Sequence, residues 1–256
     1  MSAGSDVQSL IRDPDIGAVE IKVTVIAEQE ELVRETVRAA DLEPVRRRVF
    51  FFDTDDLALL GGDVVLRARV TRDDDDDSTV KLRPVDPARI DRRWKRKTKG
   101  FEIELDIVGD EPTCSAKLEQ TQRRGEIDAV ADEERPIRKL FSDDQEDLLR
   151  EYKPDKVSWG DLEVLGPIEV EKWEWRPRGF PHAVTIEEWV LPDQSDFLEL
   201  SIKVDPSEAI EAGDAFRALL VEHKLDPDGD AQAKTRWALE FFTGTADRAP
   251  GGLAEE

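Results

Sequence analysis

The sequence predicts an α+β protein in which about eight strands form one antiparallel β-barrel with flanking helices. Several segments alternate strictly between apolar and polar residues, which is the period of a strand with one buried face. The clearest are residues 19–25 and 101–108. Most of these segments are joined by short turns, and no change of composition between residues 18 and 243 marks a domain boundary. We therefore expect a flexible lead over residues 1–17, a single domain over 18–243 and a disordered tail over 244–256.

The elements follow one another with helices between and after the strands. Leu32, Val33 and Val37 recur at helical spacing, and Ser142 with Gln145 three residues later is typical of a capping box. The predicted strands cover residues 18–26, 46–52, 64–71, 79–85, 101–108, 168–175, 183–191 and 197–204. The predicted helices cover residues 28–40, 142–152, 207–223 and 231–242.

Three polar segments carry weaker signals. The aspartates of residues 73–77 are interpreted as a solvated hairpin loop, because like charges in a row repel one another and stay hydrated. The basic run of residues 92–99 is interpreted as an exposed loop. The alternative is that these residues bind a phosphate chain or RNA. Residues 110–135 are polar and weakly patterned, with helical parts at most.

The overall charge argues against some classes of partner. Lysine and arginine number 37, aspartate and glutamate number 60, and the formal net charge is −23. Such a field repels DNA and anionic membranes unless bases are gathered locally. We find no secretory signal pattern and no apolar run near the ~20 residues of a membrane helix. A cytoplasmic protein with neither a DNA nor a membrane partner is expected, as a monomer or a homodimer.

The sequence lacks the residues or motifs that several common types of functional site require. Cys114 is the single cysteine, which excludes an internal disulfide and a cysteine-based zinc site. Neither a Walker-type phosphate loop nor a GxGxxG motif is present. The two histidines, His182 and His223, are interpreted as surface or cap residues, so serine–histidine catalysis is disfavoured.

Charges of one sign gather on the polar faces of successive strands. Arg67 and Arg69 share one face, as do Lys81 and Arg83 on the next strand, while residues 102, 104 and 106 are all acidic. Facing water, such like charges would repel one another without compensation. Inside a closed barrel the bases could bind phosphates, for which the arginine fork is suited, and the acids could hold Mg²⁺ or Mn²⁺. The alternative is that each strand turns an ordinary polar face to solvent.

Short segments along residues 18–240 resemble the motifs of the CYTH superfamily, the triphosphate tunnel metalloenzymes. Glu20 and Lys22 match part of its ExExK signature, and Arg67 and Arg69 match its LRxR strand. The remaining matching segments are Phe51-Phe52-Asp53-Thr54, Thr79-Val80-Lys81-Leu82-Arg83, Phe101-Glu102-Ile103-Glu104, Phe197-Leu198-Glu199-Leu200 and Lys234-Thr235-Arg236-Trp237.

The resemblance implies an eight-stranded antiparallel barrel whose tunnel binds a triphosphate with Mg²⁺ or Mn²⁺. Glu20, Glu102 and Glu104 would be catalytic, and Glu102, Glu104 and Glu199 would hold the metal. The residues that would bind the phosphates are Lys22, Arg67, Arg69, Lys81 and Arg83. Lys172 or Arg176 would supply a further base.

The leading hypothesis is metal-dependent hydrolysis of inorganic triphosphate or of a nucleoside or thiamine triphosphate. Ala18 and Ser201 stand where the family pattern has glutamates, both on the metal side. The pattern therefore also suits a module that binds a triphosphate or polyphosphate without hydrolysing it. Two further hypotheses are a class IV adenylate cyclase and a structural protein with solvated strands.

Overall fold

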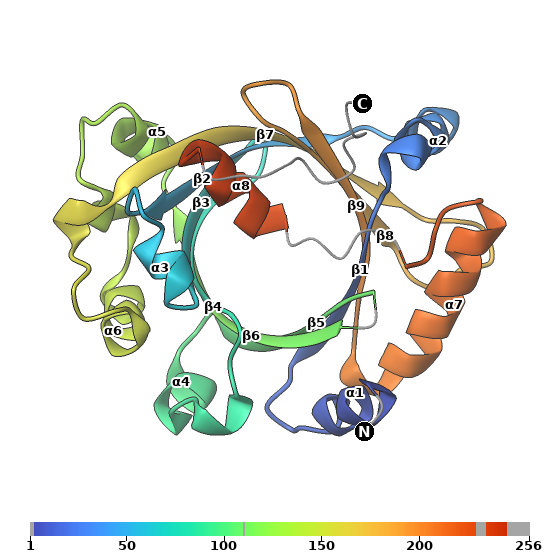
Figure 1. Ribbon diagram of the computed structural model, residues 1–256, viewed down its shortest axis with the longest axis horizontal. Helices are drawn as coiled ribbons and strands as arrows, with labels where there is room; N and C mark the ends of the chain where they lie inside the picture. The colour runs from blue at the N-terminus through green and yellow to red at the C-terminus, as the bar shows by residue number, and fades with distance from the viewer. Residues whose placement is uncertain (1–2, 110, 229–233, 245–256) are drawn as a thin grey trace.

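A closed barrel forms the centre of the protein in the computed structural model, which describes residues 3–109, 111–228 and 234–244. Within these residues nine strands form the barrel, and Figure 1 looks along its axis. The strands are β1 (Ala18–Thr24), β2 (Val45–Asp53), β3 (Val64–Thr71), β4 (Asp76–Leu82), β5 (Phe101–Val108), β6 (Glu111–Gln122), β7 (Glu163–Trp175), β8 (Val184–Val190) and β9 (Asp196–Val204). Their order around the barrel is β1-β5-β6-β4-β3-β2-β7-β8-β9, and β9 pairs with β1.

The expectation of eight antiparallel strands was wrong in two respects. The strand β6 lies in the segment 110–135, which the sequence left without a strand. In addition, β1 pairs in parallel with β5, so the barrel is mixed. Because β6 lies between β4 and β5, the chain must cross from β4 past β6 before it enters β5. This crossover leaves the far edge of β5 free to accept β1.

The helices lie mainly around the outside of the barrel, as Figure 1 shows, and α8 extends across one opening. They are α1 (Ala3–Ile11), α2 (Ala27–Ala39), α3 (Ala58–Gly61), α4 (Arg92–Lys97), α5 (Glu126–Ala131), α6 (Asp143–Tyr152), α7 (Ala209–Glu222) and α8 (Lys234–Phe242). The Ser142 capping box of α6 is confirmed. None of the helices in the described part of the chain is long and apolar enough to cross a bilayer.

Three local expectations differ from the structure. The lead segment contains α1, and the basic run forms α4 within the β4–β5 crossover in place of an exposed loop. The aspartate run is only partly a loop, because Asp76 and Asp77 are buried at the start of β4. The predicted residues 231–233 and 245–256 lie outside the described residues.

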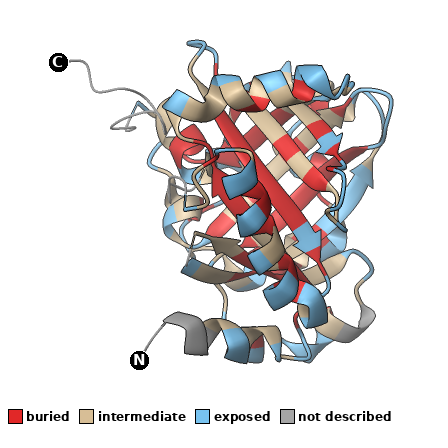
Figure 2. Cartoon of the chain, turned by 90° about the vertical axis from the view of Figure 1, so that its right-hand side faces the viewer, coloured by how far each residue is buried: buried red, intermediate tan, exposed pale blue. Residues whose placement is uncertain are grey.

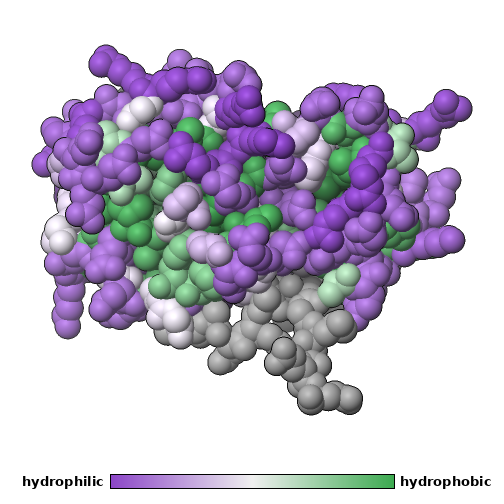
Figure 3. Space-filling view, turned by 90° about the horizontal axis from the view of Figure 1, so that it is seen from above, coloured by the Kyte–Doolittle hydropathy of each residue, from purple (hydrophilic) through white to green (hydrophobic). Residues whose placement is uncertain are grey.

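Two hydrophobic clusters occupy opposite faces of the barrel wall. Alternation along β2 sends Phe50 and Phe52 outward, into the cluster beneath the helices. Val49 and Phe51 point inward, into a second cluster that α8 covers. Figure 2 shows the buried residues concentrated along the strands. Seen from above, hydrophilic side chains cover most of the surface, with smaller hydrophobic areas between them (Figure 3).

Candidate functional site

The inward faces of the strands carry a dense set of charged side chains, which we call the tunnel set. Alternation and a chain of ion pairs place them together inside the barrel. Its bases are Lys22, Arg47, Arg67, Arg69, Lys81, Arg83, Lys117, Lys172, Lys203 and Lys234. Its acids are Glu20, Asp77, Glu102, Glu104, Asp106, Glu119, Glu187 and Glu199. Bases outnumber acids in this set, whereas the whole chain has a net charge of −23.

Asp106 on β5 is the junction of one ion-pair group. Its side chain is 0% exposed, and its carboxylate lies 3.2 Å from the Nζ of Lys22, 3.2 Å from the Nζ of Lys81 and 3.6 Å from a guanidinium nitrogen of Arg83. The hydroxyl of Ser115 donates a hydrogen bond of 3.0 Å to it. Burial alone would raise the pKa of Asp106, but the three bases outweigh burial and hold its pKa below the usual range. The predicted site omitted Asp106, although it continues the alternation of Glu102 and Glu104.

Glu20 and Lys22 extend this group along β1. The Nζ of Lys22 lies 2.9 Å from the carboxylate of Glu20, whose side chain is 25% exposed. Burial would lower the pKa of Lys22, yet Glu20 and Asp106 raise its pKa above the ordinary value. The lysine therefore stays charged while it is buried.

Glu104 and Glu102 belong to a second group of ion pairs, in which both carboxylates contact the same two lysines. Lys117 Nζ lies 2.8 Å from Glu104 and 3.3 Å from Glu102. Lys203 Nζ lies 3.4 Å from Glu102 and also bonds to Glu104. Burial raises the pKa of Glu104, but Lys117 and Lys203 outweigh it and leave the pKa at about 2. Neither lysine was assigned to the site from the sequence, because Lys117 lies on β6, a strand that was not predicted, and Lys203 lies outside the matched motifs.

The opposite wall, from β2, β3 and β7, carries one base that has carboxylate partners and others that lack close ones among the described residues. Arg69 pairs with Asp77 at 2.8 Å and with Glu119 at 3.1 Å. Arg67 has no carboxylate within ion-pair distance among the described residues, its Nε has no hydrogen-bond partner, and its Nη2 reaches only Thr79 at 3.4 Å. Burial and the neighbouring Arg69 lower the pKa of Arg67 to about 10.

Arg47 and Lys172, like Arg67, are bases with a lowered pKa and without a close carboxylate partner among the residues that the structure describes. The Nε of Arg47 is buried without a partner in the described part of the chain, and its nearest carboxylate, on Glu187, is 3.7 Å away. Burial lowers the pKa of Arg47 and of Lys172, and in each case a nearby arginine adds to the effect. Arg176, the other base considered, is 72% exposed and pairs with Glu174, so it lies outside the tunnel set.

The helix α8 contributes one base to the tunnel. Lys234 Nζ lies 2.6 Å from Glu187 and 2.5 Å from Glu199, and 4.9 Å from the ring centroid of Trp189. The ring of Trp237 on α8 stacks on Phe197 with centroids 6.0 Å apart. This packing holds α8 over the apolar end of the tunnel.

The predicted phosphate binders all belong to the tunnel set, whereas the three predicted metal ligands fall into two groups. Glu102 and Glu104 pair with Lys117 and Lys203, and Glu199 pairs with Lys234. Within the described ranges, no three acidic, histidine or cysteine side chains are placed to hold a metal ion. This arrangement does not fit a divalent cation held jointly by Glu102, Glu104 and Glu199, and the need for Mg²⁺ or Mn²⁺ stays a prediction.

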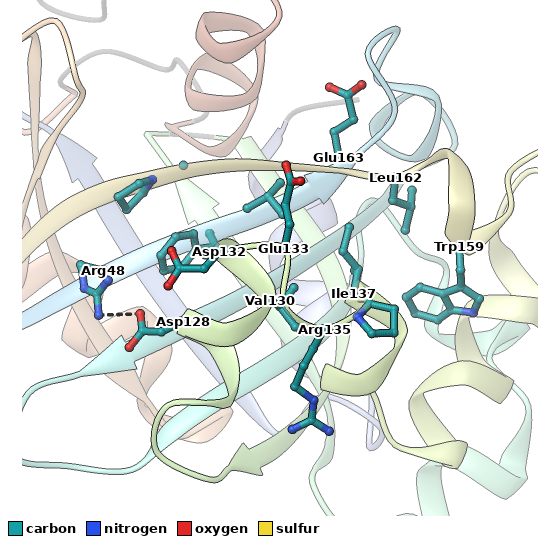
Figure 4. Close-up of a pocket in the computed structure, with 16 residues that line it drawn as sticks. Arg48, Asp128, Val130, Asp132, Glu133, Arg135, Ile137, Trp159, Leu162 and Glu163 are labelled. Carbon is teal, nitrogen blue, oxygen red and sulfur yellow. Dashed lines mark ion pairs between the residues drawn. The ribbon is translucent and has the colours of Figure 1, made fainter.

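A separate cavity of about 1290 Å³ lies outside the barrel, between β2, β7 and α5. Figure 4 shows Arg48 and Asp128 of this cavity pointing toward one another, and they form an ion pair of 2.8 Å. The other lining arginine, Arg135, pairs with Glu126. Both arginines of this cavity are thus paired, whereas the tunnel holds the Nε atoms of Arg47 and Arg67, which are buried without a partner in the described residues, so we place the candidate site in the tunnel.

Comparisons with known proteins agree with the barrel. No family model and no curated protein matches the sequence. A "putative adenylate cyclase" from Bacillus halodurans is similar with a TM-score of 0.59 and 14% identity, over 87% of this chain and 99% of that chain. A "putative adenylyl cyclase" from Hippeastrum, described as having a dominant triphosphatase activity, is similar with a TM-score of 0.61 and 14% identity, over 90% of this chain and 96% of that chain. These structures have the CYTH fold, so the likeness supports the fold suggested by the motifs in its closed barrel with flanking helices, although the barrel of this chain is nine-stranded and mixed.

Proposed function

We propose that this CYTH-fold barrel binds the phosphate chain of a triphosphate-containing small molecule in its tunnel. The observation that carries the proposal is Arg67, a half-buried arginine whose Nε is buried without a hydrogen-bond partner and which has no carboxylate within ion-pair distance among the described residues. A buried charge without a partner costs several kcal/mol unless a ligand or a neighbour compensates it. Phosphate oxygens are suitable ligands, because an arginine fork can donate two parallel hydrogen bonds to them.

Several bases around Arg67 favour a chain of phosphates over a single one. Arg69 and Arg47 are close enough to interact with one another electrostatically, and Lys172 interacts with both. On the other side, Lys22, Lys81 and Arg83 converge on Asp106, and only Lys22 has a second carboxylate, that of Glu20, so three cations share two negative charges. A ligand with several negative charges in a row can compensate both groups at once.

Calorimetry with inorganic triphosphate, ATP, thiamine triphosphate and orthophosphate tests the proposal. We expect the triphosphates to bind more tightly than orthophosphate. Arg67→Met should weaken triphosphate binding roughly 10- to 150-fold, the effect of about 1.5–3 kcal/mol for a charged hydrogen bond. The matched control is Arg150→Met, since Arg150 is 69% exposed on α6. Equal affinities for wild type and Arg67→Met would contradict the proposal.

Hydrolysis of the bound triphosphate is the second candidate, supported by the triphosphatase activity described for the Hippeastrum protein. In this hypothesis Glu20, Glu102 and Glu104 are the catalytic carboxylates, as the motifs predicted. Release of phosphate and formation of cyclic AMP should be measured with each triphosphate, with and without Mg²⁺ or Mn²⁺. Phosphate release supports the hydrolase, cyclic AMP supports the cyclase, and binding without turnover supports the binding module.

A further inference from the structure

We propose that Lys117 and Lys203 take the place of a divalent cation on the acidic side of the tunnel, so that a triphosphate binds there without a metal ion. This inference rests on the proposed function. It goes beyond it by assigning a role to two lysines outside the matched motifs and by predicting the cation dependence of binding.

The geometry around Glu104 carries the inference. Glu104 is 3% exposed, and the ammonium groups of Lys117 and Lys203 both contact its carboxylate. The same two ammonium groups lie 3.3 and 3.4 Å from Glu102. Two positive charges therefore bridge two carboxylates, which is the charge balance that one divalent cation would give.

Asp106, the next acid on the same face of β5, leaves no more room for a cation. It is 0% exposed and meets three bases. A metal ion at either position would have to displace ammonium groups that already neutralise the carboxylates. Moreover, Ser201 and Ala18, on the strands adjoining this region, offer no carboxylate to recruit.

The two lysines also lie where a phosphate chain would meet them. Lys117 is directly opposite Lys81 on the neighbouring strand, and Lys203 is opposite Glu20. Like charges opposite one another destabilise a sheet unless each has a partner. A lysine ammonium is a point charge on a flexible stem, so it can contact a carboxylate and a phosphate oxygen at once. Side-chain exposures of 22% for Lys117 and 46% for Lys203 leave both accessible to a ligand.

Calorimetry with inorganic triphosphate, in EDTA and then in excess Mg²⁺ or Mn²⁺, gives the first test. We expect tight binding in EDTA and weaker binding with the cations, because the cations also complex the free triphosphate. Binding that requires Mg²⁺ or Mn²⁺ would overturn this inference and leave the proposed function intact. An absence of binding in both conditions would overturn both.

The double variant Lys117→Met/Lys203→Met gives the second test. It should lose at least tenfold in triphosphate affinity in EDTA, and it should gain Mn²⁺ binding, measured as loss of the free Mn²⁺ signal in electron paramagnetic resonance, because Glu102 and Glu104 are released. Lys139→Met/Lys156→Met is the matched control, since both residues are exposed outside the tunnel. Circular dichroism verifies that each variant is folded. A folded double variant with unchanged triphosphate affinity would overturn the inference, as would wild-type protein that binds Mn²⁺ as tightly as the variant does.

Discussion

Replacing Asp106 by asparagine should destabilise the protein strongly, because the amide keeps the shape of the side chain and removes its charge. The carboxylate is fully buried and lies within 3.6 Å of three bases, Lys22, Lys81 and Arg83. Removing one partner of a buried ion pair costs about 3–5 kcal/mol, since the other charge is left uncompensated. That loss is a large part of the roughly 5–15 kcal/mol by which proteins are stable.

Urea unfolding at pH 7, followed by circular dichroism, measures the effect. Asp106→Asn should lower the free energy of unfolding by about 3–5 kcal/mol at an unchanged denaturant slope. The melting temperature should fall by about 6–20 °C, given 2–4 °C per kcal/mol for a chain of this size. The control Asp155→Asn changes an exposed loop residue and should stay within about 0.5 kcal/mol of wild type.

The dependence on pH follows from the direction of the pKa shift. The pKa of Asp106 is lowered from 3.8 in the folded protein, so its stabilising effect is present above that value and is lost as the pH falls further. The difference in stability between wild type and Asp106→Asn should therefore be constant from pH 7 to pH 5 and shrink below about pH 4. A difference under about 1 kcal/mol at pH 7, or one that grows on acidification, would refute the central role of Asp106.

Three further predictions concern the tunnel and its wall. Arg69→Ala should weaken binding of inorganic triphosphate by about 1.5–3 kcal/mol in calorimetry, whereas an unchanged affinity would place Arg69 outside the site. Burial lowers the pKa of Lys81 to about 8, so triphosphate affinity should fall as the pH rises from about 7 to 9, and Lys81→Met should abolish that fall; a pH-independent wild-type affinity would argue against it. Gly166→Ala should lower the free energy of unfolding by about 1–3 kcal/mol, because Gly166 has φ +145° and an added Cβ would lie 2.9 Å from the carbonyl oxygen of Val49. Gly61→Ala, with nothing within 4 Å of the added Cβ, is the control, and an equal effect of both changes would contradict the strain argument.

Local alternation was enough to predict most of the barrel, because it is a property of each strand by itself. The strand β6 was not predicted because its outward-facing residues include the small Cys114 and Ala116, which give only a weak pattern of apolar alternation. The parallel pairing of β1 with β5 joins residues 86 positions apart, and no short stretch of sequence encodes it.

The burial of Asp76 and Asp77 shows tertiary contacts overriding a local rule. Charge repulsion along the aspartate run predicted a hydrated loop. In the structure, Asp76 accepts a hydrogen bond of 3.0 Å from the backbone N–H of Thr71, and Asp77 pairs with Arg69. Both partners lie on the neighbouring strand β3, so their effect could not be seen within the run itself.

The site was predictable in its residue types and less so in its pairings. Alternation alone brought Lys22, Arg67 and Lys81 to the inner wall. Which acid each base meets depends on strand order and register, and these place Lys117 beside Glu102 and Lys203 beside Glu104. The acids that looked like metal ligands in the sequence are therefore neutralised by lysines from other strands.

The pairing of β1 with β5 and β9 also has a consequence for how the chain folds. The first strand pairs with β5, 86 residues further along, and with β9, about 180 residues further along, so one of its edges stays unpaired until most of the chain has been synthesised. Such non-local pairings slow folding, because the entropy of closing a long loop is lost before the contacts form. A ribosome-bound chain that ends before β9 would expose one edge of β1 and one edge of β8, and exposed edges promote aggregation. Ring closure by the last strand is therefore the step at which newly made chains of this protein would most need a chaperone.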